Sequence, residues 1–205
     1  MALGARLLHR CLVTTAVPLL TNAELCEQAD ALAPPSVGEV IAGVLYVMGR
    51  PPPAHASVEE GLIIDLKEGR RGGGPPPEGW YFKLEVEVRF ESDEKVVPDV
   101  AGWLNHRIAG HRNDNPIRMV PDWVCEILSD STRRKDLGPK RDLYAQQAVK
   151  HLWLVDPQTR QLEAFALGPD GRWVLLGSWF DDAVVSCPPF EQTPLAMSRW
   201  WLVDS

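Results

Sequence analysis

The sequence has few cysteines, no excess of positive charge and no long apolar run. Its four cysteines, Cys11, Cys26, Cys125 and Cys187, show no spacing typical of a zinc site or a disulfide framework. The formal net charge of -7 excludes a general polyanion binder, so any nucleic-acid site must be a local basic patch. No apolar run approaches the roughly 20 residues of a membrane span. Without such a run we expect no membrane partner. Because Cys125 lies in an apolar strand, we expect a buried thiol and therefore a reducing, cytoplasmic compartment.

The length of 205 residues fits one domain with peripheral extensions, and 45% hydrophobic residues are enough for a real core. Residues 1–19 carry a short apolar run that Pro18 interrupts, without a convincing small-residue cleavage site. We expect an N-terminal extension or first helix there rather than a cleaved signal. The single domain is expected over residues 20–195, followed by a tail over residues 196–205.

Hydrophobic periodicity predicts a mixed sheet flanked by helices, an α/β (α+β) class with β extensions on both sides. Helical spacing is found in three segments: 23–32, 54–68 and 133–149. Strand patterns are found at 80–90, 96–103, 123–128 and 151–155, and in a terminal hairpin over 162–167 and 173–179. Residues 39–48 read either as two short strands turning at Ala42-Gly43 or as one bulged strand.

Glu126 is the sharpest anomaly, because its strand is apolar on both faces like a covered central strand. An ionised carboxylate there has a large desolvation cost unless it is paired with a cation or binds a metal. Asp99 also lies on a short strand beside apolar residues. Two carboxylates at neighbouring strand ends can hold one Mg²⁺ or Mn²⁺. The alternative is that Glu126 simply pairs with an arginine or lysine.

Basic residues follow the Glu126 strand on the next predicted helix. Lys140 lies four residues after Asp136, so it forms either a surface ion pair with that residue or reaches back to orient water or phosphate. Arg133, Arg134 and Lys135 form a cluster suited to backbone phosphates. Solvated surface charge is the alternative for each of them.

Several motifs together resemble one known family. They are Pro98-Asp99-Val100, the block from Pro121 to Ser129, the run Ser131 to Asp136 with Lys140 and Tyr144, and His151 to Pro157. These resemble the Uma-type family of bacterial endonucleases, in the PD-(D/E)XK restriction-endonuclease-like superfamily. The resemblance covers roughly residues 20–167.

The resemblance implies a divalent-metal-dependent, DNA-cleaving fold with Asp99 and Glu126 as metal ligands. Such nucleases often carry a lysine two residues after the glutamate, where this sequence has Leu128, so Lys140 is the expected substitute. Glu39 matches an upstream family glutamate and is either a third ligand or a paired core carboxylate. His55 resembles the histidine that opens the first core helix, although helix capping or packing is the preferred interpretation. Asp136 is a further candidate.

The leading hypothesis is therefore a Mg²⁺-dependent endonuclease that acts on DNA, with Asp99, Glu126 and Lys140 as catalytic residues. The alternatives are a nuclease-derived binding or assembly module without activity, and a purely structural protein in which a local cation neutralises Glu126. The tryptophans of the C-terminal hairpin and tail indicate either a homodimer interface or a cover for the domain's own core. They are Trp173, Trp179, Trp200 and Trp201.

Overall fold

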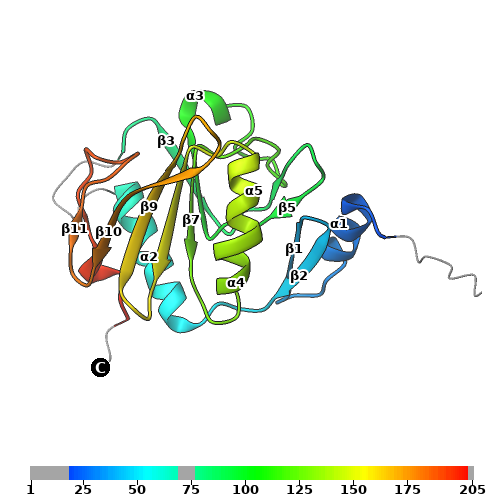
Figure 1. Cartoon of the computed structure of the whole chain (residues 1–205), viewed down its shortest axis with the longest axis horizontal. Coiled ribbons are helices and arrows are strands. Elements are labelled where there is room, and N and C mark those ends of the chain that lie inside the picture. Colours follow the sequence, from blue (N-terminus) through cyan, green and yellow to red (C-terminus); the bar gives the residue numbers. More distant parts are fainter. Residues whose placement is uncertain (1–18, 69–76, 203–205) are drawn as a thin grey trace, which may run out of the picture.

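A six-stranded mixed sheet forms the centre of the molecule (Figure 1). The structure is a computed structural model that describes residues 19–68 and 77–202. Only the pair β7–β8 is parallel within this sheet, and the helical connection between these two strands makes that possible. The strands in spatial order are β10 (Trp173–Phe180), β9 (Gln161–Leu167), β8 (His151–Asp156), β7 (Trp123–Ile127), β6 (Val100–Leu104) and β3 (Trp80–Leu84).

A smaller four-stranded sheet stands beside the first, with the order β2-β1-β5-β4. Its strands are β1 (Val37–Ile41), β2 (Val44–Met48), β4 (Val88–Arg89) and β5 (Lys95–Val96). Ala42 and Gly43 both have positive φ, 50° and 73°, which is the backbone of a tight two-residue hairpin turn. The interpretation of residues 39–48 as two strands is therefore confirmed. Helix α1 (Asn22–Asp30) packs on this hairpin and begins with a capping box between Thr21 and Glu24.

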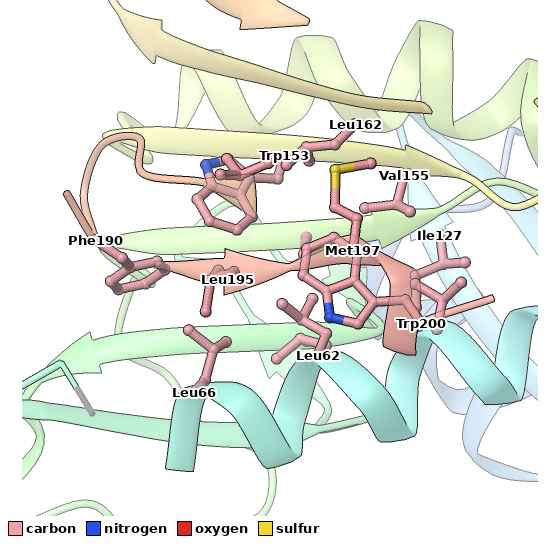
Figure 2. Close-up of a cluster of buried hydrophobic side chains, with 14 of the residues drawn as sticks. Leu62, Leu66, Ile127, Trp153, Val155, Leu162, Phe190, Leu195, Met197 and Trp200 are labelled. Atoms are coloured by element: carbon pink, nitrogen blue, oxygen red, sulfur yellow. The ribbon is translucent and has the colours of Figure 1, made fainter. Parts of the chain in front are cut away.

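One face of the central sheet is covered by helix α2 (Pro53–Glu68) and by the last described residues of the chain. Figure 2 shows Leu62 and Leu66 of α2 facing Ile127, Trp153 and Val155 of the sheet, with Met197 and Trp200 packed among them. Every labelled side chain in this layer is apolar, so it supplies hydrophobic stabilisation without charge. The segment that closes it contains β11 (Val184–Val185), β12 (Leu195–Ala196) and the 3₁₀ turn η2 (Met197–Arg199).

The opposite face is covered by helix α5 (Arg141–Gln146), with Leu143 and Tyr144 buried against β7 and β8. Alternate residues of β7 divide between the two faces: Val124 lies in this second core, while Cys125 lies in the first. The short helix α3 (Asn105–Ile108) buries Ile108 in the second core. Burial on both faces explains why β7 reads as continuously apolar.

The predicted strand over residues 80–90 is wrong as a single element. It breaks at Glu85, whose φ of 42° is incompatible with an extended strand, and its two parts join different sheets. The side-chain alternation over 80–90 continues through this break, so periodicity alone did not reveal it.

The predicted helix over residues 133–149 is also divided. The chain forms α4 (Arg133–Lys135), a π-helical turn η1 (Asp136–Lys140) and α5, with non-helical dihedrals at Gly138. A single continuous helix over 133–149 would turn Leu137 and Ala148 toward the sheet, yet Leu137 is 38% exposed and Ala148 is exposed as well. The kink at Gly138 changes which side chains face the sheet.

The tail tryptophans cover the domain's own core. Trp200 is fully buried and its indole Nε1 donates to Asp65 of α2 at 3.1 Å. Trp201 is buried too, while Trp173 and Trp179 are half-buried. The mixed α+β class is confirmed, whereas the expected extension over residues 1–19 falls almost wholly outside the described residues. Within those residues, no helix is both long enough and apolar enough to cross a membrane.

Candidate active site

Glu126 and Asp99 are brought together by strand register. Strands β6 and β7 pair Val100 with Cys125, and one further step along this antiparallel ladder places Asp99 opposite Glu126. Directly opposite residues have Cβ atoms about 4.5–5.5 Å apart. The backbone N–H of Ile127 donates to Asp99 Oδ2 at 2.6 Å, which fixes that carboxylate beside the end of β7.

Lys140 points its amine at Glu126 rather than into solvent. Its Nζ lies 2.7 Å from Glu126 Oε2, 2.8 Å from Glu39 Oε1 and 3.1 Å from the carbonyl oxygen of Val97. The side chain is only 1% exposed, so the alternative of a surface ion pair with Asp136 does not describe it. Asp136 instead lies 3.4 Å from the amine of Lys135.

Glu39 is fully buried and is surrounded by donors. Its carboxylate accepts the N–H of Val97 at 2.7 Å and contacts the amines of Lys135 and Lys140. Burial alone would raise the pKa of Glu39, but the two ammonium groups hold it below its ordinary value. This is the geometry expected of a paired core carboxylate. Lys135, expected to be one of several phosphate-binding surface residues, is buried in this cluster.

Both carboxylate oxygens of Glu126 are engaged. Tyr144 donates its hydroxyl to Oε1 at 2.5 Å, while Lys140 holds Oε2. Burial nevertheless raises the pKa of Glu126 well above its ordinary value, because Lys140 offsets only part of the desolvation and Asp99 and Asp136 repel a further negative charge. Carboxylates outnumber ammonium groups in this cluster, so an added cation would be stabilised there.

Helix α2 contributes a second set of ionisable residues. His55, in its first turn, places Nε2 3.1 Å from Asp99 Oδ2. Burial alone would lower the pKa of His55, but Asp99 raises it overall, and the pKa of Asp99 is lowered in turn. The preferred interpretation of His55 as a capping or packing residue is therefore incomplete, because His55 contacts the candidate site residue Asp99.

Glu59 lies one turn after His55 and is buried with no hydrogen-bond partner at Oε1. Burial, Glu85 and Asp99 raise the pKa of Glu59 to about 7. Sequence reasoning missed this residue. The four-residue spacing from His55 is the signal that could have found it, because it puts both side chains on one face of the helix.

A cleft of about 460 Å³ opens over this cluster. It is lined by most of the candidate residues, namely His55, Asp99, Glu126, Lys135, Asp136 and Lys140. Glu39 lies beneath the cleft wall rather than on it. Arg133 and Arg134 are not among the lining residues: Arg133 pairs with Asp156, and Arg134 is exposed.

A metal at this position would depend on few protein ligands. Across residues 19–68 and 77–202, no three His, Cys, Asp or Glu side chains are arranged to hold a metal ion. Mg²⁺, however, commonly takes only one or two carboxylates and completes its shell with water and phosphate oxygens. Asp99 and Glu126 match that donor set, and carboxylates outnumber ammonium groups around them. The residues present therefore fit a hard divalent cation.

The architecture is a mixed sheet between helices, with an acidic pair and a lysine at a cleft. A crystal structure described as a "putative nuclease" from Anabaena variabilis ATCC 29413 has a similar fold, with a TM-score of 0.64. The two sequences are 20% identical, and the match covers 86% of this chain and 96% of the other.

The family follows from the sequence match. Residues 26–198 match the Uma2 family, described as "Putative restriction endonuclease", and the chain belongs to that family. The expected family resemblance is thus confirmed. Comparison with curated proteins finds no match.

Proposed function

We propose that the protein is a divalent-metal-dependent endonuclease that hydrolyses DNA phosphodiester bonds. The observation that carries the proposal is the acidic pair formed by the partly exposed Asp99 and the buried Glu126, with the amine of Lys140 2.7 Å from Glu126, at the wall of an open cleft. Nuclease-family membership supports the reaction class.

Asp99 and Glu126 would hold Mg²⁺ or Mn²⁺, and the bound ion supplies charge stabilisation and a more acidic water. The remaining residues position these ligands. Ile127 N–H and His55 fix the Asp99 carboxylate, and the hydroxyl of Tyr144 fixes Glu126. Each ligand is thus oriented by a hydrogen bond from a neighbouring element, as in other metal sites.

Lys140 acts as a fixed positive charge. Burial alone would lower its pKa, but the surrounding carboxylates raise that pKa well above the ordinary value, so it stays protonated and donates hydrogen bonds rather than accepting a proton. Its role is to orient Glu126 and to stabilise negative charge that develops at the phosphate. Leu128, two residues after Glu126, is buried and its N–H donates to the carbonyl oxygen of Val155, so the lysine function falls to Lys140.

DNA would enter over the exposed rim of the cleft. The net charge of -7 confines phosphate contacts to local cations, of which Arg134 is exposed beside the cleft-lining Thr132 and Lys135. Arg133 is half-exposed and could contribute after release from Asp156.

A second candidate function is DNA binding without cleavage. Lys140 favours it, because all three of its hydrogen-bond partners belong to the protein and its side chain is nearly inaccessible. A degraded nuclease that retained only its structural ion pairs would have the same arrangement.

Nicking of supercoiled plasmid in Mg²⁺ or Mn²⁺ tests the proposal. We expect the wild type to cut, chelation to stop cutting, and Glu126→Gln to lower the rate by about 10²–10³-fold. Glu60→Gln is the matched control, since Glu60 is exposed on α2. Equal nicking by the wild type and Glu126→Gln refutes the assignment of the site. DNA binding by both proteins without any cleavage supports the second function.

A further inference from the structure

Strand β10 forms one edge of the central sheet. It stands at the end of the strand order, where it pairs with β9. In the part of the chain that the structure describes, no strand pairs with its outer side. A free edge presents unpaired backbone donors and acceptors to another strand.

This edge carries none of the usual side-chain protection. Residues 173–180 include no charged residue and no proline. Four apolar side chains are exposed along it, with Val174 at 52%, Leu175 at 51%, Leu176 at 40% and Phe180 at 53%. Natural edge strands are commonly blunted with lysine or proline, so an apolar, uncharged edge indicates that something covers it.

The register of β10 is compatible with pairing to itself. Along β9, Trp173 and Phe180 pair with residues 167 and 161, and the single irregularity lies between Leu175 and Gly177. Leu176 is the extra residue at this irregularity, so three residues pair with β9 on each side of Gly177. In a second copy that is antiparallel about a two-fold axis at Gly177, with Leu176 of both copies left out of the ladder, Trp173 would lie opposite Phe180 of the other copy.

Charges at the two ends of β10 complete this symmetry. Arg172 precedes the strand and Asp181 follows it, and both are exposed. In the same antiparallel register, Arg172 of one copy lies beside Asp181 of the other, at both ends of the paired strands. Within its own chain Arg172 reaches Asp170 only at 3.9 Å, with its side chain 86% exposed, so it remains available.

We propose that two copies of this chain associate by antiparallel pairing of their β10 strands about a two-fold axis. The two sheets then form one continuous sheet across the dimer, as in other isologous interfaces. Arg172 and Asp181 set the register, and the exposed apolar side chains are removed from water. This inference does not depend on the proposed nuclease function.

Sedimentation of the full chain over a range of concentrations tests the proposal by charge exchange. We expect a wild-type dimer, and Arg172→Glu and Asp181→Lys should each weaken its association by at least about tenfold, because each change is present twice in the dimer. The double variant Arg172→Glu/Asp181→Lys should regain most of the affinity. Val184→Ser is the matched control, since Val184 is exposed at 62% on β11, outside the proposed interface.

A monomeric wild type overturns the proposal. A dimer that neither single charge change weakens, or that the double exchange fails to restore, overturns it as well, because the copies then meet elsewhere. Asp181 has a φ of 52°, a conformation that aspartate and asparagine tolerate better than lysine. Asp181→Asn, with an unchanged melting temperature, therefore provides a version of the test that keeps the backbone preference.

Discussion

The two faces of the central sheet are built on different principles. On the α2 face, side chains such as Leu62, Trp153 and Trp200 form a continuous apolar layer (Figure 2). On the α5 face, the apolar layer gives way at the end of β7 to a buried cluster around Glu126 and Lys140. Apolar burial stabilises the fold at any pH, whereas buried ion pairs roughly break even once desolvation is counted. The cluster therefore adds little net stability, and the opposite face supplies most of it.

Breaking the charged cluster should have the largest effect on stability. Lys140→Met leaves the carboxylates of Glu39 and Glu126 buried without their shared ammonium group. We expect a loss of about 3–5 kcal/mol in the free energy of unfolding near neutral pH. The loss should shrink toward about pH 5, because those carboxylates can then take up protons in the folded state. Chemical denaturation at several pH values measures both effects.

Lys150→Met is the control for that experiment, since Lys150 is exposed. A Lys140→Met variant as stable as the wild type across the pH range would show that the cluster contributes nothing to folding.

Breaking the apolar face should have an effect of similar or smaller size and no pH dependence. Leu62→Ala removes a fully buried side chain from the α2 layer and should cost about 2–5 kcal/mol. Leu137→Ala, at a site 38% exposed, is the matched control and should cost much less. Urea unfolding at two pH values gives the comparison. A pH-dependent cost at Leu62 would contradict the division between the faces.

The smallest effect on stability is expected at Glu59 of α2. Its pKa of about 7 exceeds the ordinary glutamate value of 4.5, so the folded state binds a proton more tightly than the unfolded state. Its contribution to stability is therefore complete below pH 4.5 and is lost as the pH rises through 7. Glu59→Gln should remove that loss and raise stability near pH 8 by about 1–2 kcal/mol, after allowance for solvent screening.

Melting temperatures of wild type and Glu59→Gln from acid to mildly basic pH check this sign. The two curves should separate as the pH rises, while Glu60→Gln follows the wild type. Parallel curves for Glu59→Gln would mean that Glu59 titrates normally.

Sequence patterns were sufficient to predict features that depend on a single strand or helix. The apolar run around Glu126 predicted a covered central strand, and that carboxylate's exceptional position followed from it. The three residues selected from the sequence, Asp99, Glu126 and Lys140, all line one cleft. The roles of these residues in catalysis remain predictions.

The features that the sequence patterns did not predict depend on packing between segments far apart in the chain. Lys135 was counted among surface cations, yet it contacts Glu39, 96 residues earlier in the chain. The choice between two environments for Lys140 stayed open because the π-helical turn and the kink at Gly138 set its direction. The break at Glu85 was missed for a similar reason: a backbone φ of 42° leaves no trace in the hydrophobic pattern. Local periodicity identifies a buried face, but the partner across that face comes from the tertiary fold.

The contact between Trp200 and Asp65 has a consequence for synthesis on the ribosome. These residues are 135 positions apart, and Trp200 lies in the same buried cluster as Leu62 and Leu66 of α2. At about 5–20 residues per second, translation needs on the order of ten seconds to pass from one to the other. During that interval α2 has been synthesised but Trp200 has not, so the apolar side of α2 lacks this part of its cover. Nascent chains halted before Trp200 should therefore be far more sensitive to protease than released ones.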